Sequence, residues 1–532
     1  MPGGGSGPIL AAMPSLLAGL LVFATSAAVL VLEILAGRIL APYVGDTLQT
    51  YTGIIGTVLA GIAAGTWLGG RLADRRPPHT LLGPTIVLGG LLTLLVLPLI
   101  ALFGPQLAGR EVSAIVFLAF LGFFAPAAVL SAVTPTVIKL QLADLDETGT
   151  VVGRLSALGT AGAIVGTFLT GFVLLAAFPT RPIVLAIGAG LIVAGGALWW
   201  WLGARRAPAG LAAAVLAALA LAAWAPVPCE LESAYFCAQV VEDPERPSGR
   251  VLMLDALPHS YVDLADPSHL EFAYTVALDA VIDTHAGDAT RLLHLGGGAF
   301  TLPRHAAATR PASTNVVVEV DPALLDLARE EFDFAPAREG VEVVIDDARL
   351  DVAERASGRY DAVLGDAFGG LAVPWHLTTV EFLADVDAAL APDGVYAVNV
   401  IDHPPYDFAH AKAATLRAVF DDVALAAPPA WLDGREGGNA VLVAGSKLEP
   451  AALEARMARR GLDWQVRHGV ALERRLSGAA ELTDDHAPVD QLLTTQPSTR
   501  TLRPRRSGAP VARSRAPRRR GAHGGSPATA PA

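Results

Sequence analysis

The stretch RLLHLGGGAF, residues 291–300, decides the fold of the C-terminal half of this chain. A five-residue run typical of a buried strand leads directly into three glycines, Gly296, Gly297 and Gly298. Glycines at this place let the backbone approach a nucleoside closely, where a Cβ would clash. A glycine turn alone is a weak signal, so the sequence around it has to identify the fold.

Short β-rich runs that end in acidic residues follow the glycines. They are NVVVEVD (315–321), VEVVIDD (341–347) and YDAVLGDAF (360–368), and further strands are predicted at 394–401 and 439–446. Helical stretches such as PALLDLAREEF lie between them. This alternation predicts a parallel, doubly wound α/β sheet, in which ligands bind at the carboxyl ends of the strands.

The acids at these strand ends suit a nucleoside ligand. Glu319 could accept hydrogen bonds from both ribose hydroxyls, Asp347 could accept one from an adenine amino group, and Asp366 would lie beside the reactive end. Glycines and acids in this order predict a class I methyltransferase-like, Rossmann-type fold that binds an S-adenosyl ligand.

The N-terminal part is a different kind of sequence. Hydrophobic residues make up 52% of the chain and charged residues 17%, and charges are sparse up to about Trp224. Most of the apolar stretches reach the length of about 20 residues that crosses a bilayer. Small residues recur along them, which lets helices approach closely in lipid. We therefore predict a polytopic α-helical membrane domain of about seven spans. The seven stretches are 14–36, 50–70, 80–103, 112–136, 155–178, 183–203 and 209–225.

Basic residues bear on the orientation of these spans. They cluster at 71–76, 139–154 and 205–206, whereas the alternate loops carry only Arg110 and Arg181. The positive-inside rule places the clusters and the N-terminus in the cytoplasm. If all seven stretches span, the soluble part lies outside the cytoplasm. If the short seventh stretch does not span, the soluble part lies inside, and the sequence leaves both open.

Single residues and the charge balance add further expectations. Glu33, inside the first stretch, is interpreted as a structural ion pair with Arg38 in preference to a functional intramembrane carboxylate. Cys229 and Cys237 are either two ordinary thiols or a disulfide in an oxidising compartment. A net charge of −12 argues against nucleic acid as a partner. The histidines show no metal-ligand spacing, so we expect no metal.

From about Cys229 to Pro392 the sequence resembles spermidine synthases, the aminopropyltransferases that use decarboxylated S-adenosylmethionine. The matching segments are ESAY (232–235), LMLDALPHS (252–260), LEFAY (270–274), LGGGAF (295–300), VVEVD (317–321), VIDDA (344–348), LGDAF (364–368) and LAPDGVYAVN (390–399). The resemblance implies a small N-terminal β-hairpin region before the α/β sheet. The whole architecture, with LTDDHAPVD (482–490), resembles bacterial fused transporter-like/spermidine synthase proteins.

The resemblance implies roles for single residues. Asp366 matches the catalytic acid, Glu319 the ribose ligand, and Asp347 with Ala348 the adenine-side pair, beside Gly296–Gly298. It further implies decarboxylated S-adenosylmethionine, or S-adenosylmethionine, as co-substrate, with no tightly bound cofactor. The implied partners are a small amine or polyamine and the lipid bilayer, with a homodimer left open. The implied location is the bacterial inner membrane.

The sequence departs from the family where the amine should bind. Ala299 and Gly369 stand where the family has acids, Phe236 and His259 where it has glutamines, and Thr275 where it usually has histidine. The nucleoside half of the site is thus retained, while the residues that would hold a diamine are largely replaced.

Together these features give a domain plan and a ranking of functions. We expect an N-terminal tail (1–12), a membrane domain (13–226), a spermidine-synthase-like domain (230–495) and a disordered Arg/Pro-rich tail (496–532). The first expectation is a membrane-anchored aminopropyltransferase-like enzyme with an altered acceptor. The alternatives are a non-catalytic nucleoside- or polyamine-binding transporter or sensor and, third, an S-adenosylmethionine-dependent methyltransferase.

Overall fold

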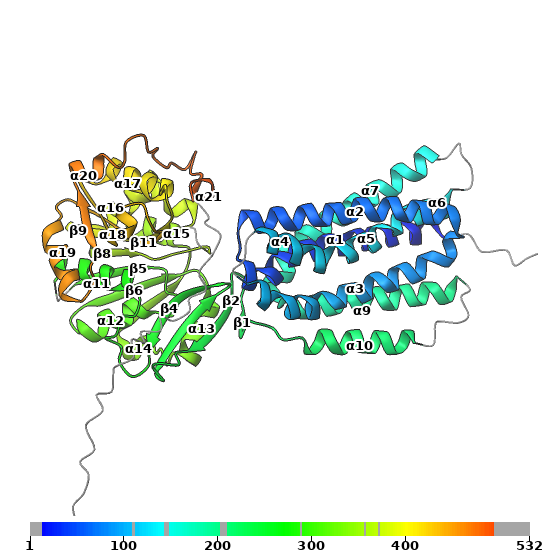
Figure 1. Ribbon diagram of the computed structural model, residues 1–532, viewed down its shortest axis with the longest axis horizontal. Coiled ribbons are helices and arrows are strands. Elements are labelled where there is room, and N and C mark those ends of the chain that lie inside the picture. Colours follow the sequence, from blue (N-terminus) through cyan, green and yellow to red (C-terminus); the bar gives the residue numbers. More distant parts are fainter. Residues whose placement is uncertain are drawn as a thin grey trace, which may run out of the picture.

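The protein consists of a helical bundle followed by an α/β region, joined end to end (Figure 1). The computed structural model describes residues 13–108, 112–142, 148–202, 210–287, 290–355, 358–370 and 373–493. The expected tails at 1–12 and 496–532, and the basic residues Arg110, Arg205 and Arg206, lie outside the described residues. Within these limits the expected fold class is confirmed: helices with candidate spans precede a doubly wound α/β sheet.

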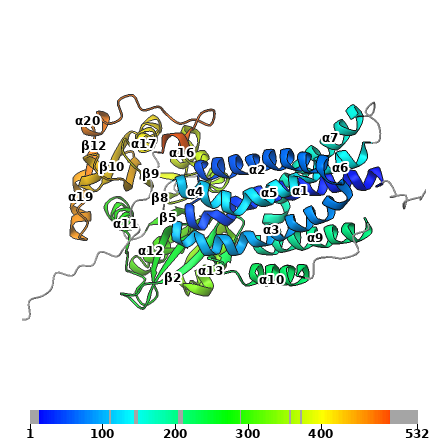
Figure 2. The same ribbon diagram turned by 45° about the vertical axis from the view of Figure 1, so that its right-hand side comes forward.

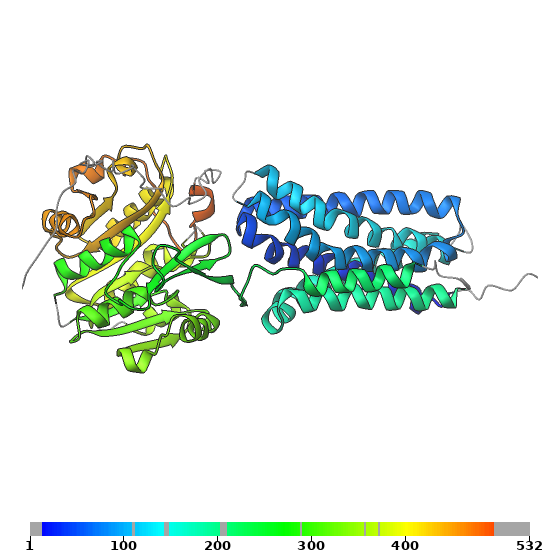
Figure 3. The same ribbon diagram turned by 60° about the horizontal axis from the view of Figure 1, so that its bottom comes forward.

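Ten α-helices and two π-helical turns form the described part of the bundle, and their axes run along its length (Figure 3). Six helical segments are long and apolar enough to cross a membrane: 15–44, 48–75, 78–107, 112–141, 148–177 and 180–201. The seventh apolar stretch forms a helix of only 14 residues, which is about 21 Å long. The elements are α1 (Ser15–Val44), α2 (Leu48–Arg75), α3 (Pro78–Leu107), α4 (Val112–Ala119), η1 (Phe120–Phe124), α5 (Ala125–Ser131), α6 (Val133–Gln141), α7 (Thr148–Leu169), η3 (Thr170–Leu174), α8 (Leu175–Ala177), α9 (Thr180–Trp201) and α10 (Leu211–Trp224).

Small residues hold the bundle helices close together, as the sequence predicts. A Cβ added to Gly65 in α2 would clash with the backbone of Ala128 in α5, and one added to Gly162 in α7 would clash with the backbone of Phe23 in α1. Large apolar side chains point outward, among them Trp200 (80% exposed). An apolar outer surface of this kind suits lipid contact.

The expected ion pair between Glu33 and Arg38 is wrong. Among the described ion pairs none includes either residue, and Arg38 instead donates to backbone carbonyls of the α/β region. The physical reason is helix geometry, because residues five apart point in directions about 140° different around the axis.

The α/β region contains two sheets (Figure 2). A four-stranded antiparallel sheet comes first, where the resemblance implied a small β-hairpin region, and an eight-stranded sheet of order β12-β10-β11-β9-β8-β5-β6-β7 follows. The strands are β1 (Leu231–Glu232), β2 (Cys237–Glu242), β3 (Gly249–Leu254), β4 (Leu257–Asp263), β5 (Arg291–Leu295), β6 (Thr314–Glu319), β7 (Val341–Ile345), β8 (Tyr360–Gly365), β9 (Leu390–Asp402), β10 (Asp422–Ala427), β11 (Gly438–Gly445) and β12 (Gln465–His468).

The large sheet is not parallel throughout, which corrects the expectation for its last strands. Strands β7, β6, β5, β8 and β9 are parallel neighbours, whereas β11 pairs antiparallel with both β9 and β10, and β12 with β10. Only ten residues separate β10 from β11 (428–437). A parallel crossover needs a dozen or more residues, so this connection reverses the chain.

Helices cover both faces of the large sheet and bury its apolar side chains. Helices α11, α12 and α19 pack on one face, and α15, α16 and α17 on the other. The helices of this region are α11 (Ala273–His285), α12 (Thr301–Thr309), α13 (Pro322–Glu331), α14 (Pro336–Glu339), α15 (Ala348–Glu354), η4 (Trp375–Leu377), α16 (Val380–Ala389), α17 (Asp407–Val419), α18 (Pro429–Leu432), α19 (Pro450–Arg459), α20 (Val470–Glu473) and α21 (Val489–Leu492). Parallel strands β5 to β8 bring their carboxyl ends to one edge, where the predicted site residues lie.

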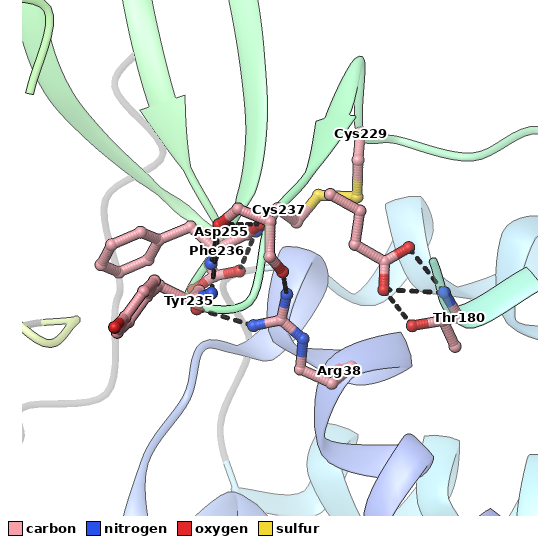
Figure 4. Close-up of a disulfide and its surroundings, with 9 residues drawn as sticks. Arg38, Thr180, Cys229, Tyr235, Phe236, Cys237 and Asp255 are labelled. Carbon is pink, nitrogen blue, oxygen red and sulfur yellow. Dashed lines mark hydrogen bonds between the residues drawn. A yellow bond between two sulfur atoms is a disulfide. The ribbon is translucent and has the colours of Figure 1, made fainter. Parts of the chain in front are cut away.

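The short strands β1 and β2 lie at the junction with the bundle (Figure 1). Cys229 and Cys237 form a disulfide there, which settles the choice that the sequence left open (Figure 4). The disulfide ties the start of β2 to the segment that leaves the bundle.

Candidate active site

The glycine turn after β5 requires glycine at its first position. Gly296 has a φ of 97°, and a Cβ there would clash with the carbonyl oxygen of Asp366. The Asp366 N–H in turn donates to the Leu295 carbonyl at 2.9 Å. The turn and the end of β8 are therefore in direct backbone contact, and an alanine at 296 would force them apart.

Glu319, the last residue of β6, closes the other side of the turn. Its Oε2 accepts the N–H groups of Gly297 at 2.8 Å and Gly298 at 3.2 Å, and its Oε1 accepts that of Asp321 at 2.9 Å. Burial raises the pKa of this carboxyl, and the three backbone donors oppose that rise. A buried carboxylate beside a glycine turn is placed to accept hydrogen bonds from a diol.

Asp347 and Ala348 follow the next strand, β7. Asp347 caps α15 by accepting the Arg349 N–H at 2.7 Å, and its other oxygen lies 3.4 Å from Nε2 of His376. Ala348 is the first residue of that helix and is buried. Asp347 therefore has a capping role, and the side chain beside it, His376, was not predicted to belong here.

Asp366, at the end of β8, has the most specific surroundings of the three predicted acids. The Asn399 amide donates to its Oδ1 at 2.9 Å, and Asn399 is held in turn by the Asn439 amide at 3.0 Å. Burial raises the pKa of Asp366 to about 6, against hydrogen bonds from Asn399 and the Tyr274 hydroxyl, which lower it. At pH 7 the carboxylate is thus ionised and remains basic enough to take up a proton.

The sequence did not single out Asn399, Asn439 or Tyr274 as functional. Asn399 could have been noticed, because it is a polar residue inside the apolar run GVYAVNVI. Its partner Asn439 lies forty residues later, on the antiparallel strand β11, and only the register of β9 with β11 brings the two side chains together.

A pocket of about 430 Å³, its open mouth included, adjoins Asp366 and the glycine turn. Its walls come from β4, α11 and α12 as well as from the turn. Its lining residues include Ser260, Tyr274, Thr275, Gly296, Gly297 and Asp366. Ser260 supports the turn, because its hydroxyl accepts the Ala299 N–H at 3.2 Å.

Aromatic rings replace polar groups on the side where the family would hold its amine. The His259 ring lies 6.3 Å from that of Phe236 and 6.1 Å from that of Phe368. Burial lowers the pKa of His259 to about 4, so this ring is neutral at pH 7. Thr275 donates to the Phe272 carbonyl, and Ala299 is fully buried. The structure thus brings the predicted glycines, Glu319 and Asp366 together, and the row of rings formed by Phe236, His259 and Phe368, here called the aromatic wall, ends two residues after Asp366 in the chain.

Comparisons with known proteins concern this same region, and no family model matches the chain. Over 135 residues it is 34% identical to a polyamine aminopropyltransferase of Vibrio vulnificus, covering 25% of this chain and 44% of that protein. It is 31% identical over 140 residues to one from Chromobacterium violaceum, covering 26% and 53%. A solved structure of a probable spermidine synthase from Corynebacterium glutamicum is 32% identical, covers 49% of this chain and 97% of that chain, and has a TM-score of 0.45.

The chain spans about half the length of the curated relatives it matches. The matched portion is about a quarter of this chain, which leaves the helical bundle outside the comparison. By sequence, the C-terminal α/β region of this protein is homologous to the polyamine aminopropyltransferases, or spermidine synthases.

Proposed function

We propose that the α/β region transfers the aminopropyl group of decarboxylated S-adenosylmethionine to an amine. The observation that carries this proposal is Asp366, a carboxyl group that accepts the Asn399 amide at 2.9 Å and lies directly beside the glycine turn, where burial raises its pKa to about 6. The nitrogen lone pair of a neutral amine attacks the aminopropyl carbon bonded to the sulfonium. The C–S bond breaks, its electron pair stays on sulfur as methylthioadenosine leaves, and Asp366 takes up the proton of the new ammonium group.

The nucleoside half of the donor fits the first three strand ends. The glycine turn Gly296–Gly298 gives the close backbone approach, and Glu319 accepts from the ribose hydroxyls. Asp347 and Ala348 lie on the adenine side, at the start of α15. These roles follow from the sequence order and from the shared edge at the carboxyl ends of the strands.

The acceptor differs from a simple diamine in our proposal. Phe236, His259 and Phe368 form a row of rings whose last member lies two residues after Asp366 in the chain, and the neutral imidazole cannot pair with a second ammonium as a carboxylate would. Rings of this kind favour an amine with an apolar body, which they can cover while Asp366 holds the single reactive nitrogen.

The bundle anchors this enzyme in the bacterial inner membrane as a multi-pass protein. Support comes from the six apolar helical segments and from their apolar outer surface. The lipid bilayer is therefore a partner of the chain in this proposal.

The test uses the purified full chain in detergent. It is given decarboxylated S-adenosylmethionine and a panel of amines that includes putrescine and alkyl and arylalkyl monoamines, and methylthioadenosine release is followed. We expect release with a monoamine that exceeds release with putrescine. No product with any amine would refute the proposal. A parallel reaction is given S-adenosylmethionine as well, and its consumption in place of the decarboxylated donor would identify a methyltransferase.

A further inference from the structure

The bundle contacts the α/β region at the turn between β1 and β2, residues Ser233–Phe236. Arg38, near the end of α1, donates to the Tyr235 carbonyl at 2.6 Å and to the Ser233 carbonyl at 2.5 Å (Figure 4). Among the described residues no carboxylate lies within 4.0 Å of this guanidinium in an ion pair. We infer that Arg38 is a positioning residue for the amine end of the active site, so that the bundle and the α/β region form one working unit. This inference rests on the proposed function.

Hydrogen bonds of the Ser233 side chain organise the turn and connect it to the α/β region. The Ser233 hydroxyl accepts the N–H groups of Tyr235 at 3.1 Å and Phe236 at 3.0 Å, and donates to Asp321 at 2.5 Å. Asp321 in turn gives its N–H to Glu319. The nucleoside end of the site is therefore tied to Ser233 by bonds that do not involve the bundle.

The amine end depends more directly on Arg38. Phe236, which completes the turn, contacts the His259 ring, and His259 contacts Phe368, two residues beyond Asp366. On its other side the turn is fixed by Cys237, which is in the disulfide and donates its N–H to Asp255 at 3.1 Å. Arg38 thus binds the carbonyls at the tip of the turn. The same turn carries Phe236, whose ring belongs to the aromatic wall.

The bundle reaches the opposite side of the site as well. The loop after α1 brings the backbone oxygen of Asp46 to 3.5 Å from the position that a Cβ of Gly370 would occupy. Gly370 lies in the segment that follows Asp366 and Phe368. The end of α1 and the loop after it therefore lie against two segments of the α/β region, the Ser233–Phe236 turn and the 368–370 segment, which follows Asp366 in the chain.

A guanidinium bonded to two neutral carbonyls makes charge-assisted bonds with a fixed spread, which glutamine cannot reproduce. In Arg38→Gln the Ser233–Asp321 bond stays, but the tip of the turn loosens. We expect the KM for the amine to rise about tenfold, the affinity for the donor to change by less than twofold, and kcat to fall by less than threefold. Arg38→Lys keeps the charge with one point of contact and should recover part of the loss.

Arg181→Gln is the matched control. Arg181 belongs to the same junction and also donates to backbone carbonyls, those of Ala223 and Ala225, and neither of these hydrogen bonds goes to the turn. Steady-state kinetics of the full chain in detergent, donor binding by calorimetry and amide hydrogen exchange at 233–236 are measured for the wild type and all three variants. Exchange at the turn should accelerate at least tenfold in Arg38→Gln alone.

Different results would refute the proposed aminopropyl transfer and the positioning role of Arg38. A wild type that turns over no amine would refute the proposed function, and exchange would still report on the turn. An unchanged exchange rate in Arg38→Gln, an unchanged amine KM, or an equal rise for Arg181→Gln would refute the positioning role.

Discussion

Asp366→Asn should lower the catalytic rate and raise the stability of the protein at neutral pH. The asparagine keeps the shape of the side chain and one oxygen for the Asn399 amide, but it cannot take up the proton of the attacking amine. Positioned acid–base groups contribute roughly 10²- to 10⁴-fold, so we expect kcat to fall by a factor in that range. Donor binding should persist, because the glycine turn and Glu319 are untouched.

Stability should rise at neutral pH in the same variant. Burial lifts the pKa of Asp366 from the ordinary 3.8 to about 6, a shift worth about 3 kcal/mol at about 1.4 kcal/mol per pKa unit. Because the folded-state pKa is the higher one, the folded state is favoured while the carboxyl is protonated, and that advantage is lost as the pH rises from about 4 to about 6. Above pH 6 the wild type therefore carries a penalty of up to about 3 kcal/mol that the asparagine lacks.

The assay compares wild type and Asp366→Asn by methylthioadenosine release and by thermal unfolding at pH 4.5 and 7.5. We expect wild-type kcat/KM to fall below about pH 6, and the variant to unfold several degrees higher at pH 7.5 and by a clearly smaller margin at pH 4.5. Asp361→Asn is the control, since Asp361 lies at the opposite end of β8 and pairs with Arg291. A variant with full activity would show that Asp366 is not the base. A variant with the same change in stability at both pH values would show that burial does not raise the pKa of Asp366.

The other predictions concern the donor and the acceptor. Glu319→Gln should weaken donor binding about tenfold or more by calorimetry, because a charged acceptor is worth about 1.5–3 kcal/mol; unchanged affinity would remove Glu319 from the ribose site. Gly296→Ala should lower the melting temperature and abolish donor binding, since φ is 97° and the new Cβ meets Asp366; a variant that binds normally would contradict the tight turn. Phe236→Gln should raise the activity on putrescine relative to monoamines, and an unchanged ratio would exclude Phe236 from the acceptor site.

The nucleoside side of the site could be predicted from the sequence because its geometry follows from strand order. Once β5, β6 and β8 are parallel neighbours, Gly296, Glu319 and Asp366 must meet at one edge. Asn399 could not be placed in the same way. Its bond to Asp366 depends on β9 lying beside β8, and its orientation depends on Asn439 of the antiparallel strand β11. The sequence of β11 indicates only a further apolar strand and gives no sign of this pairing.

The contacts between the bundle and the α/β region could not be predicted from the sequence for a similar reason. Arg38 and Glu33 look like partners along the chain, and nothing local points Arg38 to Ser233 and Tyr235, almost two hundred residues later. Contacts between regions depend on how two folded bodies meet, and composition carries no record of that. The disulfide is an intermediate case, since the spacing of Cys229 and Cys237 permitted a closed loop without requiring one.

The position of the α/β region at one end of the bundle predicts the side of the membrane on which it lies. The basic residues Arg71 and Lys139 lie near the end of α2 and of α6, whereas the α/β region adjoins the other end of the bundle, where α1 ends and α9 begins (Figure 1). With the basic end in the cytoplasm, α10 has to return the chain across the bilayer, although its 14 residues cover only about 21 Å of a core of about 30 Å. The disulfide favours the same, oxidising side.

We therefore expect alkaline phosphatase fused after Leu493 to be active and a fluorescent protein at the same place to be dark. This side of the membrane bears on the chemistry, because S-adenosyl donors are made in the cytoplasm and a charged sulfonium does not cross a bilayer unaided. Intact spheroplasts that express the chain should then release methylthioadenosine from donor added outside, and Asp366→Asn spheroplasts should not. Release only after lysis, together with a bright fluorescent fusion, would place the α/β region in the cytoplasm and show that α10 does not span.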